Sequence, residues 1–499
     1  MALEISGSPG KPPLLGDTPL EGRELGPCMR WRRRRSEHPT PRICNAVRAE
    51  FRQHGKLLPL ALAQMLLLAD QPLLSTNMSQ VAEELRLDEH EKDELLGGLV
   101  SVVYFTCGAL SSLLAGRLAD VMRRISLVRI CMLLGSAGTF LNSQASSLGG
   151  ILLCRGAVGA ALGGLLPASF AMLADLYPAE ERPHAVALVA IISGVGPGLG
   201  QGLAGTMGPA WGWQAPFACV GVCGFSLSLL LFGYLREPPG MDKVEDAGDR
   251  NQLCGTWVRD LRIPTVVLIC LQGITGCVPW AVINTFLTDY LAQNGGLGVL
   301  RATGVFLSFG IGCTTGTVLG GKLGQFLYKK DKGFQAALMA ATTWIGMVPI
   351  FILFAIGDGG GQCWLFHLLA LTGGVLVAGT GGNAKAILLN TVPVKSRGSL
   401  FGVYTIMDDL GKGLGPALVA SWVRALGRRV SFMIGISFWL PCGLFCWKMI
   451  RTVRLDDKAE IGSPASASTR TGDSSAREDI GSTTSTRMGP GSPGGSSSA

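Results

Sequence analysis

Charged residues are scarce in this chain: Asp, Glu, Lys and Arg together make up 16% of its 499 residues. The net charge of +8 is small for this length and no basic soluble module is present, so we expect no nucleic-acid partner. Only five histidines occur, and the 14 cysteines include no Cys-x-x-Cys pair and no metal-ligand spacing. No clustered nucleophile, acid or metal set is present either. We therefore expect no enzymatic activity, no catalytic residues, no metal and no cofactor.

Apolar residues make up 48% of the chain and gather in blocks of about twenty, the length that a helix needs to cross a hydrocarbon layer of about 30 Å. The 70 glycines suit membrane helices that pack closely together. The sequence therefore predicts an all-α membrane protein with twelve transmembrane helices. Their expected extents are 57–78, 95–115, 125–146, 149–176, 185–207, 214–235, 264–290, 299–320, 334–356, 364–391, 398–420 and 430–450.

A polar segment between the sixth and seventh spans divides the helices into two groups of six. The predicted organisation is a basic, disordered cytosolic tail (1–56), a six-helix bundle (57–235), a cytosolic linker (236–263), a second six-helix bundle (264–452) and a disordered Ser/Gly-rich tail (453–499). The arginine run at 30–35 suits either a cytosolic flank of the membrane or a contact with anionic lipid head groups. No apolar segment follows Met1, so we expect no cleaved signal peptide.

Basic residues in the loops predict the orientation of the chain. They gather in alternate loops, which places the linker and both termini in the cytosol. The basic groups of these loops are Arg117, Arg123 and Arg124, then Arg236 to Arg262, Lys322 to Lys332, and Lys395 with Arg397. One loop disagrees, because Arg424, Arg428 and Arg429 fall on the predicted outer side.

The two halves repeat each other at three points, as the halves of many transporters do. The paired segments are Gly116–Asp120 with Gly321–Gln325, Pro178–Arg182 with Pro393–Arg397, and Gly196–Pro197 with Gly415–Pro416. Each pair falls at an equivalent place relative to the predicted spans. The chain is therefore expected to form two pseudo-symmetric bundles.

Residues 57–450 resemble the major facilitator superfamily. Its loop signature, G-x-x-x-D-R-x-G-R-R, is kept at Gly116, Asp120 and Arg124, with Val121 and Arg123 as departures. Its other signatures are matched by Arg155-Gly156 in the fourth span and by Gly196-Pro197-x-x-Gly200, which Gln201 follows in place of glycine, in the fifth. The resemblance implies a secondary transporter that works by alternating access, with helices 1, 4, 7 and 10 around a central cavity.

The same resemblance implies a set of gating residues. In that family the residues corresponding to Asp120 and Arg124 join charge networks that hold the outward-facing state, and we expect Asp175 to pair with Arg124. Proline at Gly196–Pro197 removes a backbone donor and should bend the fifth helix. The predicted gating set is Gly116, Asp120, Arg124, Asp175, Gly196 and Pro197.

Within the superfamily, the chain resembles the Spinster-like lysolipid and sphingolipid transporters. The supporting segments are Arg155–Gly159, Asp175–Tyr177, Leu410–Pro416 and the Asp70 of LLLADQP. Three positions depart from that pattern: Gln71, Leu162 and Lys412 stand where Spinster proteins carry ionisable residues. The resemblance implies a small organic or lysolipid-like solute, with possible proton coupling as a further expectation.

Asp70 and Arg155 are the principal candidates for a central site. Asp70 lies about fourteen residues into the first span and Arg155 about seven into the fourth, so both lie roughly 10 Å below the outer boundary at ~1.5 Å per residue. An ionisable side chain at this depth costs at least about 2.5–3.5 kcal/mol and normally faces a partner or a cavity. The pair either fixes helix packing or binds an anionic head group or a coupling proton.

Further candidates lie in the second half. Lys385, near the inner boundary, either extends to the interface or contacts the solute. Asp408 and Lys412 are four residues apart on one face and either neutralise each other or face the cavity. Trp280 and Asn284, also four apart, offer aromatic and hydrogen-bonding contacts, and core packing is the alternative for Trp280.

We therefore expect a secondary active transporter in contact with the lipid bilayer and a small-molecule or lysolipid substrate, and we expect a monomer. Two alternatives stay open: a transporter of sugars or organic anions, and a non-transporting membrane receptor or scaffold on the same fold.

Overall fold

The computed structural model describes residues 57–121, 123–176, 182–234, 260–356, 363–392 and 397–461, and these ranges are helical apart from short turns. The first half holds α3 (Leu57–Ala69), α4 (Gln71–Thr76), α5 (Met78–Glu84), α6 (Glu89–Glu91), the π-helix η1 (Lys92–Leu99), α7 (Val100–Val121), α8 (Arg124–Asn142), α9 (Leu148–Leu176), α10 (Arg182–Gly194), α11 (Gly196–Trp211) and α12 (Gln214–Tyr234). The second half holds α14 (Pro264–Gln293), α15 (Gly298–Lys330), α16 (Lys332–Ala355), α17 (Cys363–Val377), α18 (Gly379–Thr391), α19 (Arg397–Ser437) and α20 (Trp439–Ile461).

The membrane spans agree with the prediction. In the described ranges ten helices are long and apolar enough to cross a membrane, and a shorter apolar helix, Gln214–Leu230, adds another. One of the ten, Leu400–Asp456, covers two spans, because the chain turns inside α19 at Gly427. The φ of Gly427 is 76°, a conformation that glycine adopts without steric cost. The twelve-helix membrane fold is therefore confirmed.

Four spans are broken within their length. The first divides between α3 and α4 at Asp70, the fifth between α10 and α11 at Val195, the tenth between α17 and α18 at Ala378, and the twelfth between α19 and α20 at Phe438. Pro72 and Pro197 stand at the first turns of α4 and α11, where their missing N–H costs no helical hydrogen bond. The fifth span is interrupted directly before Gly196–Pro197, where the sequence predicts a bend.

Three groups of buried apolar residues show how the halves meet. One core lies within α3, α7–α10 of the first half, for example Leu60, Val128 and Leu165. A second lies within the second half, for example Ile269 and Leu400. The third combines both halves and is built from the opposite ends of the helices; its members include Leu73, Phe217, Phe286, Tyr290 and Phe432.

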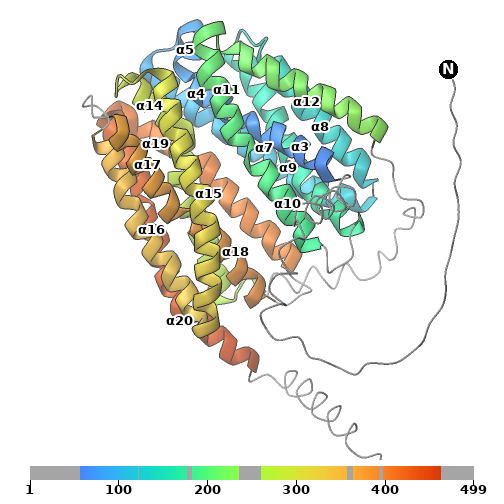
Figure 1. Cartoon of the computed structure of the whole chain (residues 1–499), viewed down its shortest axis with the longest axis vertical. Helices are drawn as coiled ribbons and strands as arrows, with labels where there is room; N and C mark the ends of the chain where they lie inside the picture. Colours follow the sequence, from blue (N-terminus) through green and yellow to red (C-terminus); the bar gives the residue numbers. More distant parts are fainter. Residues whose placement is uncertain are drawn as a thin grey trace, which may run out of the picture. The chain divides into compact units, whose positions relative to one another are not determined.

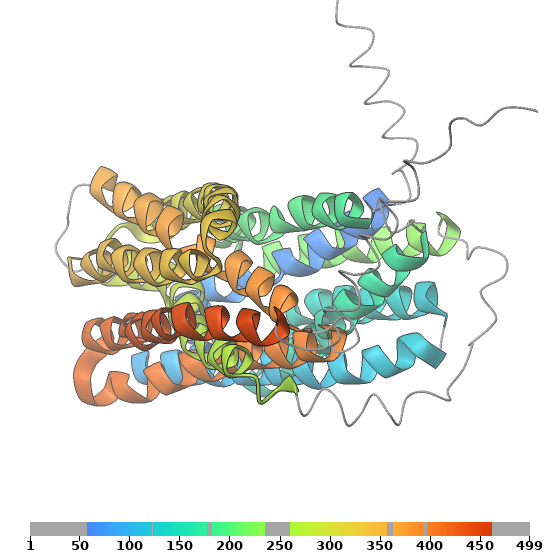
Figure 2. The same cartoon turned by 90° about the horizontal axis from the view of Figure 1, so that it is seen from below.

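We call the end that holds Glu84, Gln293 and Gly427 the outer end, and the end that holds Leu57 and Lys330 the inner end, after the predicted orientation. The halves share one core at the outer end and have separate cores at the inner end. Figure 1 shows the blue-to-green first half beside the yellow-to-red second half, and Figure 2 shows the same two groups from below.

Candidate functional site

The predicted pair of Asp70 and Arg155 is formed. A guanidinium nitrogen of Arg155, Nη1, lies 2.8 Å from Oδ2 of Asp70 and 3.3 Å from its backbone oxygen. The Thr139 hydroxyl donates to Oδ1 of Asp70 at 2.9 Å, so both carboxylate oxygens are bonded. Asp70 is 0% exposed and Arg155 2% exposed. The pair ties the break between α3 and α4 to α8 and α9.

The remaining surface of Arg155 is also covered by the first half. Its guanidinium carbon lies 4.9 Å from the centre of the Phe217 ring on α12. With its amide oriented to accept, Asn142 receives hydrogen bonds from Nε and Nη2 of Arg155 at 3.2 Å each. The guanidinium is therefore enclosed in this conformation, and the substrate role expected for the pair remains a prediction.

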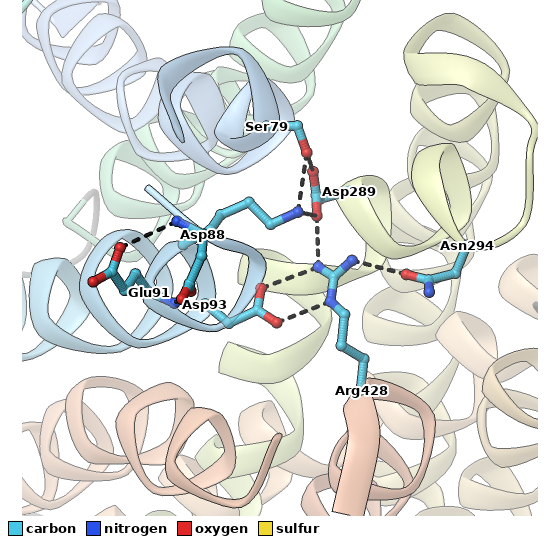
Figure 3. Close-up of polar contacts among 8 residues, drawn as sticks. Ser79, Asp88, Glu91, Asp93, Asp289, Asn294 and Arg428 are labelled. Atoms are coloured by element: carbon cyan, nitrogen blue, oxygen red, sulfur yellow. Dashed lines mark hydrogen bonds and ion pairs between the residues drawn. The ribbon is translucent and has the colours of Figure 1, made fainter. Parts of the chain in front are cut away.

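A second cluster of charges joins the two halves at the outer end, and Figure 3 shows it. Arg428 of α19 binds both carboxylate oxygens of Asp93 of η1, through Nε at 2.9 Å and Nη2 at 3.1 Å. Its Nη2 also donates to Asp289 of α14 at 2.5 Å, and its Nη1 donates to Asn294 at 2.8 Å. Every guanidinium nitrogen of Arg428 thus has a partner.

Lys92 and Ser79 complete this cluster from the first half. The Lys92 ammonium lies 3.2 Å from Asp289 and donates to the Ser79 hydroxyl at 3.1 Å. The Ser79 hydroxyl donates to Asp289 at 2.5 Å. The two cations and two carboxylates are at most 8% exposed. We call Ser79, Lys92, Asp93, Asp289, Asn294 and Arg428 the outer charge cluster. Breaking such a buried pair is costly because it leaves an uncompensated charge.

Local sequence places the first half's share of the cluster. The Asp88 carboxylate accepts the backbone N–H of Glu91 at 2.6 Å, and the Glu91 carboxylate accepts that of Asp88 at 3.1 Å, which forms a capping box. The Glu91 N–H lowers the pKa of the exposed Asp88 carboxyl. This cap opens the helical turn that leads into η1, where Lys92 and Asp93 follow.

The second half's share depends on the turn at Gly427, which Arg428 follows. A cavity of about 340 Å³ opens beside it at the outer end, lined by Glu89, His90, Asn294, Val423, Leu426, Gly427, Arg428 and Arg429. Sequence reasoning did not find the outer charge cluster. The sequence feature that could have indicated it is the basic loop at Arg424–Arg429, which disagreed with the predicted orientation. Arg428 in this loop pairs with two carboxylates, Asp93 and Asp289.

Below the cluster, uncharged contacts continue the closure. Gln201 of α11 donates from its amide nitrogen to the Thr288 hydroxyl of α14 at 2.9 Å. Gly98 of η1 lies so close to α19 that a Cβ placed on it would be 2.9 Å from the backbone of Ala417. The departure at Gln201 thus forms a polar contact between the halves.

Lys412 lies at the inner limit of these contacts. Its ammonium is 5.9 Å from the centre of the Phe105 ring of α7, and Gly413 packs against the same residue. The side chain of Lys412 is 35% exposed and that of Asp409 20% exposed, and the two form an ion pair of 3.1 Å. The direct contact of Lys412 is thus with Asp409, three residues away, and the charge of Asp408 also acts on Lys412. Whether Asp408 and Lys412 face the cavity stays a prediction.

Asn284 and Trp280 lie in different environments. Asn284 is exposed and lies one helical turn inward of Thr288, on the same face of α14. Its amide donates to the Trp280 carbonyl at 2.8 Å. The Trp280 ring packs on Phe309 at 5.4 Å and on Trp439 at 6.2 Å between centroids, which places it against the core that both halves share.

The remaining predicted residues are placed as follows. Lys385 on α18 is exposed. Gly196 is buried and packs against the carbonyl of Met65 on α3, while Pro197 beside it is partly buried. The side chains of Gly116, Asp120, Arg124 and Asp175 lie outside the described part of the chain, so their predicted gating role stays a prediction.

This arrangement defines a class: a polytopic membrane protein whose halves share a core and a charge cluster at one end and have separate cores at the other. The sequence pattern of the Major Facilitator Superfamily matches residues 60–416, so the chain belongs to this family.

Relatives of known activity agree. The chain is 24% identical over 383 residues to the multidrug resistance protein MdtG of Dickeya zeae, covering 75% of this chain and 89% of that protein. It is also 24% identical over 370 residues to the sialic acid transporter NanX of Escherichia coli, covering 73% and 85%.

Solved structures agree on the fold. A bacterial homologue of the human lysosomal transporter Spinster, inward-facing and unoccupied, matches with a TM-score of 0.69 at 18% identity, over 81% of this chain and 98% of that one. A D-xylose-proton symporter matches with a TM-score of 0.62 at 17% identity, over 80% and 98%. Its membership of the Major Facilitator Superfamily makes the chain a membrane transporter and not an enzyme.

Proposed function

We propose that this transporter carries a small organic or lysolipid-like solute that bears an anionic group, and that the structure represents its inward-open state. The outer charge cluster is the outer gate in this proposal. It holds the halves together at the outer end, while the separate inner cores leave a path from the cytosolic side. Both termini lie in the cytosol in this proposal.

The observation that carries the proposal is the position of Lys412. This cation is partly exposed at the point where the closed outer contacts end. A cation at membrane depth is costly unless it serves a partner or a pathway. Lys385 supplies a second exposed cation from α18, and Asn284 supplies an exposed amide from α14. An anionic group that reaches this point meets a cation and hydrogen-bonding groups from several helices.

Asp70 and Arg155 act in this proposal as positioning residues: they hold in place the helices of the first half that line the site. Their charges act on the Tyr104 hydroxyl, as does that of Asp409. Tyr104, buried on α7, is thus within electrostatic reach of the buried pair of the first half and of Asp409 in the second half.

The names of the relatives are divided. A sialic acid transporter and a galacturonate transporter favour an anionic solute, whereas a multidrug resistance protein and a probable sugar efflux transporter do not point to one. The sequence resemblance to Spinster-like transporters, at Arg155–Gly159 and Asp175–Tyr177, favours a lysolipid-like solute instead. A small hydrophilic anion without a lipid tail is thus the second candidate.

Uptake into proteoliposomes tests the proposal. The panel contains lysophosphatidylglycerol, sialic acid, nicotinate and neutral glucose, with lysolipid in the outer leaflet removed by albumin before counting. We expect uptake of at least one anion and none of glucose. Lys412→Gln should lower that uptake by about ten- to a hundredfold, because a hydrogen bond to a charged group contributes roughly 1.5–3 kcal/mol.

Lys322→Gln is the matched control, because Lys322 is an exposed lysine on α15 toward the inner end. Uptake of glucose alone would contradict the anionic class. Equal uptake by the Lys412 and Lys322 variants would remove Lys412 from the site.

A further inference from the structure

Basic side chains gather at the inner end of the second half, where α15 ends, α16 begins and α20 leaves the membrane. Two carboxylates, Asp331 and Asp456, lie in the same segments, residues 329–334 and 447–456. The exposed cations there outnumber them. We call these cations the inner basic patch: Lys329 and Lys330 on α15, and Lys448, Arg451 and Arg454 on α20.

One ion pair joins the two parts of the inner basic patch. Nε of Arg454 lies 2.9 Å from Oδ1 of Asp331, the residue that follows Lys330. Asp331 also caps α16, because its carboxylate accepts the backbone N–H of Gly333 at 2.7 Å. A Cβ placed on Gly333 would lie 2.6 Å from Nε of Arg454, so the glycine leaves room for the guanidinium. These contacts bring the end of α15 and the end of α20 to one place.

Exposed aromatic rings lie beside two of the cations. The Lys330 ammonium is 4.6 Å from the centre of the Phe326 ring, and the guanidinium carbon of Arg454 is 5.9 Å from that of Phe334. The two phenylalanines are 54% and 43% exposed. Such pairs are typical of the membrane interface, where apolar groups meet the acyl chains and the charged ends of lysine and arginine extend to the head groups.

The helix α20 carries the other cations through the inner boundary of the membrane. Its span is expected to end near residue 450, and the helix continues to Ile461. Lys448, Arg451 and Leu455 are exposed and lie three or four residues apart, which places them on one face of α20. In the described part of the chain Lys448 and Arg451 have no ion-pair partner. This face therefore presents two uncompensated charges close to the expected level of the head groups.

The chemistry of the patch favours phosphate. Arginine binds phosphate through two parallel N–H groups, and lysine binds it as a point charge. Clusters of four to eight such residues directly beside a membrane helix on the cytosolic side are typical of sites for anionic lipids. A basic loop that only orients the chain needs no fixed geometry, whereas here the Arg454–Asp331 pair holds cations from two helices together.

We propose that the inner basic patch binds an anionic phospholipid of the leaflet at the inner end, one whose head group carries phosphate monoesters. Such a head group offers several phosphates, so it meets cations from both α15 and α20, whereas a phosphodiester offers one charge. The bound lipid fixes the inner end of the second half at the membrane surface. This inference does not depend on which solute is carried.

Binding of a fluorescent phosphatidylinositol bisphosphate to the purified full-length chain in detergent, followed by anisotropy, tests the proposal. We expect saturable binding that the unlabelled lipid displaces at least tenfold better than phosphatidylserine, phosphatidylcholine or free inositol trisphosphate. Lys330→Gln/Arg451→Gln should weaken binding by about thirtyfold, the effect expected for two basic groups beside an anionic lipid surface.

The matched control is Arg301→Gln/Arg424→Gln, which removes two exposed arginines at the outer end. It makes the same change in net charge and should bind the lipid as the wild type does. Lys330→Arg/Arg451→Lys keeps both charges and should also keep binding.

Equal affinity of the wild type and the Lys330→Gln/Arg451→Gln variant, or an equal loss in the control, would overturn the proposal. Displacement by phosphatidylserine as strong as by the bisphosphate would refute the phosphate-monoester class. Displacement by inositol trisphosphate as strong as by the lipid would refute a lipid as the ligand. If the double variant does not fold, Arg451→Gln alone decides: it should weaken binding about fivefold, and unchanged binding would refute the site.

Discussion

Arg155 shows how one buried side chain can look like a substrate ligand in the sequence and yet be fully occupied in the structure. Its partners, Asp70, Asn142 and Phe217, come from three elements of the first half. Each partner was visible in the sequence, but only Asp70 stands out there, because its charge is improbable at membrane depth. A threonine or an asparagine in a membrane span carries no such signal.

The first prediction concerns this residue. Arg155→Ala leaves the Asp70 carboxylate buried with the Thr139 hydroxyl as its side-chain partner. We expect a loss of about 3–5 kcal/mol in stability, the usual cost of removing one member of a buried ion pair. Thermal unfolding in detergent micelles measures this loss. Arg301→Ala, at an exposed arginine of α15, is the control and should change little.

The alternative role gives a different result. If Arg155→Ala is as stable as the wild type but has lost transport, the guanidinium contacts the solute directly and does not act as a positioning group.

At the scale of elements, η1 is the segment that lets the halves approach. Gly97 lies against the Phe286 ring of α14 and Gly98 against the backbone of α19. Both glycines follow Lys92 and Asp93 within the same short π-helix. One element therefore carries both the charges of the outer gate and the small residues that allow it to close, a combination typical of close contacts between membrane helices.

The second prediction follows from this contact. Gly98→Val should hold the outer end apart, because its Cβ alone would lie 2.9 Å from the Ala417 backbone, which has little freedom to move. We expect a cysteine introduced at Thr288 to react with a membrane-impermeant maleimide from outside in Gly98→Val and not in the chain with native Gly98.

Gly202→Ala in α11 is the control, since no atom lies within 4 Å of the added methyl group. Labelling of Thr288→Cys that does not increase in the Gly98 variant would show that η1 tolerates the larger side chain and does not set the closure.

For the whole molecule, the arrangement of the three cores indicates how the two halves can move. Each inner core belongs to one half, so each half can move as a body, whereas the shared outer core must come apart when the outer end opens. Loss of contacts at one end should therefore accompany approach at the other.

The third prediction tests this relation with distances. Spin labels at Glu83 and Leu300 report on the outer end, and labels at Leu118 and Leu323 report on the inner end; all four side chains are exposed. Arg428→Ala leaves Asp93 and Asp289 without their shared guanidinium, so the outer distance should lengthen and the inner distance should shorten. An outer distance that grows while the inner one stays unchanged would contradict rigid movement of the two halves.

The fold was largely predictable because bilayer thickness, glycine content and the internal repeat all report on spans directly. The contact between Asp70 and Arg155 was predictable because two opposite charges at the same depth in the membrane are stabilised when they pair. The outer charge cluster was not, because Asp93 and Asp289 stand close to expected helix ends, where a charge needs no partner. The pairing of Lys412 with Asp409 was missed because spacing on a helix fixes direction only to within a turn, and side-chain rotamers select the partner.

The outer charge cluster has a consequence for the response to membrane voltage. The first half contributes Lys92 and Asp93, and the second half contributes Asp289 and Arg428. Each half thus brings one positive and one negative charge, so separating the halves transfers no net charge through the field. A full elementary charge moved across the membrane is worth about 2.3 kcal/mol per 100 mV, and the gate itself avoids this energy. The membrane potential therefore acts on a charged solute that crosses the membrane and not on the opening of the outer gate.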